Sequence, residues 1–465
     1  MPSTSSQHPD SLRLIPDQAT PAGYRGRPHR PFPTGTLHPL LGRHVLVVGV
    51  DYAPQRSGIA PHTTGLAEHL AEMAGSVSVL AGRPEHPVPG PSVSLGRYGP
   101  AGHPLHPNPG LAAGSSVRAG QSGPGDRTGP IVLRLRRGAV RREGSPLRAG
   151  DELSFLTSAL STALPHVPDL VLAVTPGLGG AVAAARIARR HGAALVVVAH
   201  DLVSTRAGGR YTARAVRIAA AGEGRLLRQA DEVAVVSPGL FGPAREHGVP
   251  LEHLHLLPHW TPPPPATDDR VTARKTLGWP SRAFTVVHAG AMGPGQDLST
   301  LVEAARLLDG QANVVLIGDG PRRAALREQG RGMRGLRFVD PPDDDGYSLA
   351  LAAADLLVVA ERPDADGLCL PGKLTAYFGA GRAVLAAVPE QSEVAAALER
   401  SDGAGLVIRP NDPELMAAAV RALMLDGPLR LSMGHAGLRF AHRRLDRSAA
   451  MHRLDTIIES ALGSG

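Results

Sequence analysis

The sequence predicts two α/β domains, each built on a doubly wound parallel sheet, and three observations support this. Short apolar runs rich in valine alternate with helical segments from about residue 44 onward, as is typical of parallel sheets that helices cover on both faces. The chain of 465 residues is too long for one ordinary domain. A proline-rich stretch, TPPPPATDD at 261–269, interrupts the alternation. We therefore expect an N-terminal domain over 41–262 and a C-terminal domain over 263–465, facing each other across a cleft.

Ahead of the first domain, residues 1–40 hold many prolines and few apolar residues, which predicts a disordered arm. The first predicted helix carries Leu66, Leu70 and Met73 on one face. Residues 82–130 are rich in Pro, Gly and Ser without any period, so we expect a long loop insertion there. The strands expected in this domain are 44–50, 76–81, 131–135 as an edge strand, 169–174, 194–199 and 232–236.

Four consecutive prolines favour an extended polyproline linker between the two domains. Beyond it, strands are expected at 284–288, 313–317, 336–339, 356–359, 383–388 and 405–408. The last segment, 428–462, is predicted to be helical throughout and to pack back on the N-terminal domain. Ligands of doubly wound sheets bind outside the carboxyl ends of the strands, so we expect the chemistry in the strand-to-helix loops.

Composition narrows the class of protein. A single cysteine, Cys369, excludes a disulfide framework and any cysteine-based metal site. We see no apolar signal-peptide core and no apolar run of about 18 residues, so a cytoplasmic protein is expected. The net charge of +7 comes from scattered arginines. They indicate either a solvated basic surface or attraction to anionic lipid headgroups or phosphorylated acceptors. Nucleic acid is not an expected partner, since no basic surface motif interleaved with aromatic residues is present.

Glycine-bearing loops before helices form the first group of candidate site residues. Ser57 and Gly58 precede the first predicted helix, and Gly318, Gly320 and Arg322 follow the strand at 313–317. Glycine lets the backbone approach a ligand closely, and free N–H groups at a helix start attract phosphate. The alternative, that these glycines only serve their turns, stays open.

A second group surrounds Lys373. Gly372 and Lys373 open a predicted helix, where a cation opposes the helix dipole unless an anion such as a diphosphate is bound. The alternative is a solvated surface lysine. Glu361, Asp364 and Asp366 lie just before this helix. They would bind ribose or sugar hydroxyls, or be ordinary loop acids.

His200 and Asp201 close the strand at 194–199 and are the candidate catalytic residues. The imidazole would bond a sugar hydroxyl, and the carboxylate would orient the ring or the acceptor. The alternative is a capping aspartate beside an incidental histidine. No histidine spacing indicates a metal site, and neither G-x-S-x-G nor G-x-x-x-x-G-K-[ST] occurs. We therefore expect no metal and no cofactor, and neither hydrolase nor P-loop chemistry.

Several segments, taken in order, resemble one family. VLVVGVDYAPQRSGIAPHTTGLAEHLA, PDLVLAVTPGLGGAVAAARIARRHGAALVVVAHDLV, ADEVAVVSPGL and LLPHWT occur in the first half. HAGAMGPGQDLSTLVEAARLL, VVLIGDGPRRAALRE, PGKLTAYFGAGRAVL and VIRPNDPELMAAAVRALM occur in the second. The set, from about residue 44 to 443, resembles the bacterial family 4 glycosyltransferases of the colanic-acid and exopolysaccharide type.

This resemblance implies a GT-B fold of two Rossmann-like domains and a retaining, metal-independent transfer. The donor would be a UDP- or GDP-sugar held mainly by the C-terminal domain. The acceptor would be a glycan or a lipid-linked sugar on the N-terminal domain, with peripheral contact at the inner membrane face. By position, Gly58 and Lys373 would meet the donor diphosphate, His200 and Asp201 would lie near the reacting sugar, and 318–321 would line the nucleotide.

The chain also departs from the family pattern. The loop that begins at Gly290, a residue we place on the donor side, often carries a basic residue in relatives. Here that loop holds Ala291, Met292, Pro294 and Gln296. The glutamate that many relatives use for ribose falls at Ala376. These departures would leave Lys373, Arg322 or Arg382 to hold the donor.

Two alternatives remain beside an active sugar transferase. The first is a degenerate GT-B scaffold that binds a nucleotide or glycan, and the second is a nucleotide-sugar epimerase with Asp366 or Glu361 as base.

A separate expectation concerns the segment 131–148, which has six arginines against one glutamate. We expect it to contact membrane phosphates or an anionic acceptor, unless it is a solvated loop.

Overall fold

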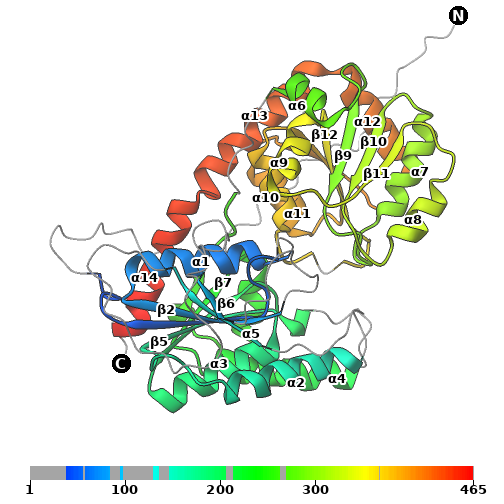
Figure 1. Ribbon diagram of the computed structural model, residues 1–465. Coiled ribbons are helices and arrows are strands. Elements are labelled where there is room, and N and C mark those ends of the chain that lie inside the picture. The colour runs from blue at the N-terminus through cyan, green and yellow to red at the C-terminus, as the bar shows by residue number, and fades with distance from the viewer. Residues whose placement is uncertain are drawn as a thin grey trace, which may run out of the picture. The chain divides into compact units, whose positions relative to one another are not determined.

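The computed structural model describes residues 38–55, 58–83, 95–97, 129–135, 146–205, 213–261, 269–365 and 367–463. Its strands in this part of the chain form two sheets, each covered by helices on both faces (Figure 1). This confirms the predicted fold class. The linker residues 262–268 and most of the predicted arm lie outside the described residues. Residues 38–40, the end of the predicted arm, are ordered instead, because a turn at His38–Leu41 buries Leu40 completely.

The first sheet has the strand order β3-β4-β2-β1-β5-β6-β7-β8. Every neighbouring pair is parallel except β3 with β4, which is antiparallel. The strands are β1 His44–Gly49, β2 Ser76–Gly82, β3 Leu95–Arg97, β4 Ile131–Leu135, β5 Leu170–Val174, β6 Ala194–Ala199, β7 Glu232–Val235 and β8 Leu254–Leu256.

Helices cover both faces of this sheet. One layer contains α2, α3 and α4, which lie together below the strands in Figure 1, and α1 lies on the opposite face. The C-terminal helix α14 packs against β6 and β7 and contacts α1 through a hydrogen bond of 2.7 Å between His69 and Asp455. The helices named here are α1 Ala60–Met73, α2 Pro146–Ser161, α3 Leu178–His191, α4 Ala213–Leu227, α5 Phe241–Glu246 and α14 Arg447–Gly463.

The second sheet is parallel throughout, in the order β11-β10-β9-β12-β13-β14. Its side chains alternate between two separate cores. Val287 and Val315 belong to the core with α10 and α13, while Val286 and Val314 belong to the core with α7 and α12. The strands are β9 Thr285–Ala289, β10 Asn313–Ile317, β11 Leu336–Val339, β12 Leu356–Ala360, β13 Ala383–Ala387 and β14 Gly405–Ile408. The helices are α6 Arg270–Leu277, α7 Leu298–Leu308, α8 Arg323–Gln329, α9 Asp344–Ala353, α10 Gly372–Gly379, α11 Glu393–Arg400, α12 Pro413–Leu425 and α13 Gly427–Arg444.

Three aspartates fix neighbouring strands to one another at their amino ends. Each stands directly before a strand, and its carboxylate accepts a backbone N–H from the start of the next strand in the sheet at 2.7 Å. The pairs are Asp169 with His44, Asp231 with Leu195 and Asp355 with Thr285. A charge-assisted bond of this kind sets the strand register. The carboxyl ends, where ligands bind, are thereby aligned as well.

Three sequence expectations for the secondary structure need correction. β4 is not an edge strand, because β3 pairs on its outer side within the segment 82–130 that was expected to be a loop. β8 was not predicted, since three residues are too few to show a period. The helical segment 428–462 is broken at Leu445 and Asp446, where the Asp446 carboxylate accepts the amide N–H of Ala449 and starts a new helix.

Candidate functional site

Four residues meet at the carboxyl ends of β9 and β12 and the start of α10. Lys373, in the first turn of α10, donates a hydrogen bond from Nζ to Oε1 of Gln296. Gln296 pairs through its backbone with Glu361, which follows β12 directly. A Cβ on Gly290 would lie 3.5 Å from the lysine Nζ. These residues make one cluster, which includes three of the candidate donor-binding residues, Lys373, Glu361 and Gly290.

The pKa values of the two ionisable side chains in this cluster are shifted. Burial lowers the pKa of Lys373 to about 8, and the Glu361 carboxylate acts against this shift. Burial also raises the pKa of Glu361, with Lys373 opposing. The Glu361 side chain is 9% exposed, and its Oε2 atom has no hydrogen-bond partner. A buried polar atom without a partner costs roughly 1–3 kcal/mol, so a ligand hydroxyl at this oxygen would be stabilising.

His288, on β9, was not singled out from the sequence. Its Nδ1 lies 3.1 Å from the carbonyl oxygen of Val358. A carbonyl only accepts, so Nδ1 carries the hydrogen and Nε2 of the neutral ring holds a lone pair. Burial and then the Lys373 charge lower the pKa of His288 well below its usual range. Its Nε2 has no hydrogen-bond partner and lies 4.0 Å from where a Cβ on Gly290 would stand.

The glycines of the neighbouring loops serve loop packing. Gly318 has a φ of 139°, and a Cβ there would stand 2.0 Å from the carbonyl oxygen of Gly290. The amide N–H groups of Gly290, Gly318 and Gly320 are donated to Ile317 O, Val339 O and the Asp319 carboxylate. The amides of Gly318 and Gly320, which were suggested for anion or nucleotide contact, therefore have partners within the protein. These glycines bring two loops together beside Lys373.

The other basic and acidic residues that the sequence analysis singled out do not all lie at this cluster. Arg322 donates to the carbonyl oxygen of Gln296 at 3.4 Å and so lies near the cluster. Arg382 instead donates to the carbonyl of Ala352 at the end of α9. Asp364 is exposed and paired with Arg362. Asp366 and Ser57 lie outside the described residues.

The start of α10 suits an anion. Pro371, at its N-cap, supplies no side-chain hydrogen bond, and the first turn has no acidic residue. Gly372 is exposed. The N–H groups of a helix start carry partial positive charge, and Lys373 adds a full cation when protonated. This end of α10 can therefore bind a phosphate group.

The second candidate group lies at the carboxyl end of β6. His200 is 6% exposed, and its Nδ1 lies 2.7 Å from Nε2 of His259. Its Nε2 has no hydrogen-bond partner. His62, in the first turn of α1, stacks on His259 with ring centroids 4.0 Å apart. The thiol of Cys369 donates to the carbonyl oxygen of His200 at 3.3 Å, which brings the segment before α10 against this histidine.

Of the two roles expected for Asp201, the structure excludes a hydrogen bond to the His200 ring, and orienting the acceptor stays a prediction. The ring of His200 is held at Nδ1 by His259 and has no bond at Nε2, so the Asp201 carboxylate does not orient it. Gly58, just before α1, has a left-handed φ of 65° and is exposed, and a Cβ added to it would meet no atom within 4 Å. Its turn requires glycine, and its surroundings leave room for a ligand.

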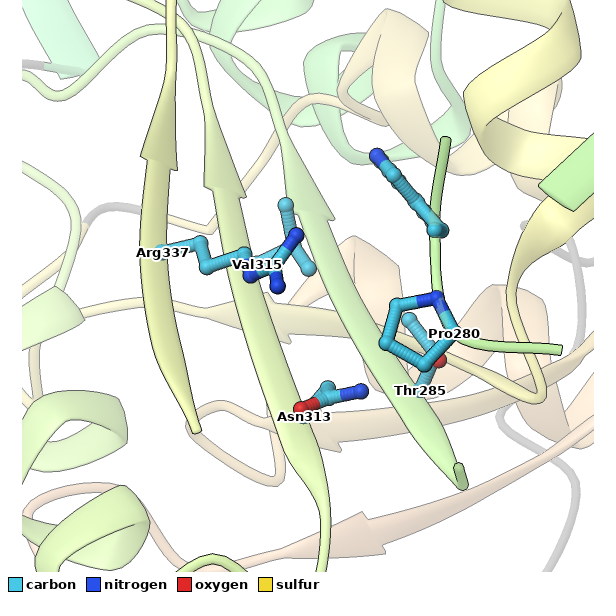
Figure 2. Close-up of a pocket in the computed structure, with 6 residues that line it drawn as sticks. Pro280, Thr285, Asn313, Val315 and Arg337 are labelled. Atoms are coloured by element: carbon cyan, nitrogen blue, oxygen red, sulfur yellow. The ribbon is translucent and has the colours of Figure 1, made fainter. Parts of the chain in front are cut away.

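A shallow pocket lies elsewhere, over the amino halves of β9, β10 and β11 (Figure 2). It is lined by Trp279, Pro280, Thr285, Asn313, Val315 and Arg337. It lies at the end of these strands opposite to Lys373 and has no room for a ligand. In the described part of the chain, no group of three histidine, cysteine or acidic side chains is arranged to hold a metal ion. No helix among the described residues is long and apolar enough to cross a membrane.

Comparison with known proteins matches both halves of the chain. Residues 57–260 match the family described as a glycosyl transferase 4-like domain, and residues 283–426 match glycosyl transferases group 1. WcaI of Escherichia coli (strain K12), which its name assigns to colanic acid biosynthesis as a glycosyl transferase, is 26% identical over 271 residues. That match covers 56% of this chain and 67% of WcaI.

Two solved structures share the fold. Sucrose-phosphate synthase from Thermosynechococcus elongatus has a TM-score of 0.69 at 17% identity, over 91% of this chain and 100% of that one. HepE of Anabaena, solved in complex with UDP and glucose, has a TM-score of 0.63 at 15% identity, over 90% of this chain and 99% of that one. The two family matches lie in tandem and together span more than half of the chain. This chain belongs to the family 4 glycosyltransferases of the GT-B fold.

Proposed function

We propose that this glycosyltransferase is a retaining, metal-independent enzyme of cell-surface polysaccharide or glycoconjugate synthesis. It would move a hexose from a UDP- or GDP-sugar to a glycan or lipid-linked acceptor. The observation that carries the donor half is the placement of Lys373, at a helix start without a side-chain cap, beside the unpartnered Oε2 atom of Glu361. The name of WcaI and the UDP and glucose bound to HepE support the same class of reaction.

In this proposal the donor diphosphate lies at the start of α10. Negative charge builds on the diphosphate as the bond to the sugar breaks, and Lys373 with the helix N–H groups would stabilise it. Glu361 would accept hydrogen bonds from hydroxyls of the ribose or the sugar. Lys373 is a cation at neutral pH and would supply the positive charge at the diphosphate, so the proposal includes no metal ion. It includes no cofactor either.

His200 would contact the reacting sugar or the attacking acceptor hydroxyl through its unpartnered Nε2. Asp201, beside it in the chain, is proposed to face the acceptor. The scaffold alternative is not favoured, because a scaffold would not need a lysine whose pKa is lowered at an anion site or buried polar atoms left without partners. An epimerase gains no support from the family matches.

Donor turnover tests this function. The full chain is incubated with a panel of UDP- and GDP-sugars, and released nucleotide is measured with and without EDTA. We expect one donor of the panel to be consumed and EDTA to leave the rate unchanged. Proton NMR of the first product formed should show the anomeric configuration of the donor. An inverted product would contradict the retaining mechanism, and loss of the rate in EDTA would contradict metal independence.

Peripheral contact with an anionic membrane at the cytoplasmic face remains part of the proposal, and the structure offers a second surface for it in addition to the segment 131–148. Arg134, in the segment 131–148, donates to backbone carbonyls of Gly82 and Ala53 and is not available to a membrane, while 136–145 lies outside the described residues. The outer side of α3 and α4 also suits phospholipid headgroups. Its exposed charged residues among the described side chains are all basic, and Ile218 is 65% exposed beside them.

Charge reversal tests this surface. The variant Arg189→Glu, Arg190→Glu, Arg225→Glu should bind vesicles of phosphatidylcholine and phosphatidylglycerol at least tenfold more weakly in sedimentation, since each arginine near the surface contributes about 1 kcal/mol. The matched control, with the same change of charge on α13, is Arg439→Glu, Arg443→Glu, Arg444→Glu. Equal binding by both variants would rule out the α3–α4 surface.

A further inference from the structure

Lys373 and Glu361 both meet Gln296, yet the cation and the carboxylate form no ion pair. Lys373 Nζ donates to the Gln296 side chain, and Glu361 pairs with Gln296 through the backbone. Within the described part of the chain, no carboxylate oxygen lies within 4.0 Å of this Nζ, and Oε2 of Glu361 has no hydrogen-bond partner. Opposite charges attract strongly where water is largely excluded, so another group must keep these two apart.

Gln296 is placed to do so. Its backbone forms an antiparallel bridge with that of Glu361, and residues directly opposite in such a pair carry their side chains on the same face. The end of the Gln296 side chain accepts the hydrogen bond from Lys373 Nζ. An ammonium group only donates, so the atom that faces it is the amide oxygen. Gln296 therefore contacts the backbone of Glu361 at one end and the ammonium of Lys373 at the other.

The backbone on each side of this contact is fixed. The segment 295–297 runs beside 360–362, joined by two further backbone hydrogen bonds of 3.1 and 3.2 Å. On α10, Tyr377 lies one turn after Lys373 on the same face. Its fully buried hydroxyl accepts the amide N–H of Ala289, at the end of β9, at 2.9 Å. Only rotation of side chains could therefore bring the ammonium to the carboxylate.

An amide suits this separation because it carries no charge. Its oxygen accepts one of the three hydrogens of the Lys373 ammonium and leaves the positive charge in place, with two hydrogens for a phosphate. A carboxylate at this position would neutralise the charge. Two other groups nearby do not compete for the ammonium. The ring of His288 is neutral, since burial lowers its pKa well below the usual range, and Arg322 is itself a cation that donates to the backbone carbonyl of Gln296.

We propose that Gln296 is a positioning residue, which holds the Lys373 ammonium away from Glu361 so that each group stays free for a different part of the donor. The ammonium is kept for the diphosphate and the carboxylate for a hydroxyl of the ribose or the sugar. An ion pair between them would have to break before the donor could bind. The separation is a property of the protein without ligand, and its role in donor binding rests on the proposed function.

The titration of Lys373 tests this separation in the full chain without ligand. The sequence holds two lysines, Lys275 and Lys373, so NMR of protein with carbon-13 at the lysine ε position gives two signals. Lys275 is exposed and serves as the internal reference. In Gln296→Met, which keeps the size of the side chain without a comparable acceptor, the ammonium should pair with Glu361. The pKa of Lys373 should then rise from about 8 to above about 9. A value in folded Gln296→Met that stays at that of the wild type or falls would overturn the proposal.

Two control variants identify the cause of the rise. Gln296→Met combined with Glu361→Gln leaves no carboxylate to pair with, so the pKa of Lys373 should not exceed that of the wild type. A rise that persists there would show that Glu361 is not the partner, and would contradict the proposal. Gln311→Met is the matched control, since exposed Gln311 also accepts from a cation, Arg421, at 3.1 Å, but lies before the amino end of β10. It should leave Lys373 unchanged, and a rise as large as in Gln296→Met would also count against the proposal.

Nucleotide affinity tests the role in donor binding, with whichever of UDP and GDP the wild type binds. Gln296→Met should weaken binding roughly fivefold, because a partly buried ion pair must first be broken. In a Glu361→Gln background the same change should have less than about a twofold effect, since no pair can form. A roughly fivefold loss in both backgrounds would show that Gln296 acts without Glu361 and would overturn the proposal. If the titration behaves as expected but neither nucleotide binds, the proposed function fails and the separation of Lys373 from Glu361 stands.

Discussion

His200→Ala is expected to lower donor turnover about a hundredfold, the usual cost of removing one preorganised group from a transition state. Its Nε2 is a buried polar atom without a partner at the carboxyl end of β6, which is where a ligand of this sheet binds. The effect should fall on kcat, since the interaction is strongest in the transition state. Affinity for the free nucleotide should change less than about twofold, because nucleotide binding is assigned to the second sheet.

The rate is measured by nucleotide release under saturating donor, and the affinity by calorimetry. His191→Ala is a matched control, because His191 is an exposed histidine at the end of α3. It should behave like wild type in both measurements. A His200→Ala enzyme with wild-type kcat would remove His200 from the site.

Lys373→Ala is expected to weaken nucleotide binding at least tenfold, because hydrogen bonds to charged groups contribute about 1.5–3 kcal/mol. Turnover should fall further, since Lys373 also stabilises the leaving diphosphate. Lys275, on α6, provides a control lysine distant in sequence. Calorimetry with UDP and GDP measures the change. Equal affinity in Lys373→Ala and wild type would show that the diphosphate lies elsewhere.

The same lysine gives nucleotide binding a pH dependence. Only protonated Lys373 attracts the diphosphate, and its pKa in the folded protein is about 8. Affinity should therefore be complete at pH 7 and fall as the pH rises through about 8, toward that of Lys373→Ala. The alanine variant should show no such fall. A wild-type affinity that stays constant up to pH 10 would contradict the assignment.

The fold could be predicted from local pattern because a strand buried on both faces needs a continuous apolar run, and each run that was predicted as a strand formed one. Strands that are held by pairing with a neighbouring strand, and that show no hydrophobic pattern of their own, were not predicted. β3 and β8 have three residues each and are held by pairing to β4 and β7. A short sequence such as LGR or LHL carries no period by which it could be recognised.

The candidate site residues that the sequence could single out are those whose chemistry and position coincide in sequence. Lys373 at a helix start and His200 at a strand end are examples. Residues that join the candidate site only because the fold brings them together were not predicted. The sequence around His62, His259 and His288 shows no motif. Only the fold brings His62 and His259 to His200 and His288 near Lys373.

Two other residues show that the residue type at a loop position does not by itself reveal its role. Gln296 was taken as the loss of a phosphate-binding cation, yet it is the residue that Lys373 and Arg322 both contact. Gly318 was taken as a nucleotide contact, yet its missing side chain makes room for the backbone of Gly290. Sequence alone does not reveal whether a glycine makes room for a ligand or for another loop.

Calorimetric titration of the wild-type chain with UDP and with GDP tests the central claim most directly. We predict that one of the two binds with a dissociation constant of about micromolar order, or about −8 kcal/mol, and that the other binds more weakly. Binding of neither nucleotide by folded protein would contradict a donor site at Lys373, and would favour the scaffold over the transferase.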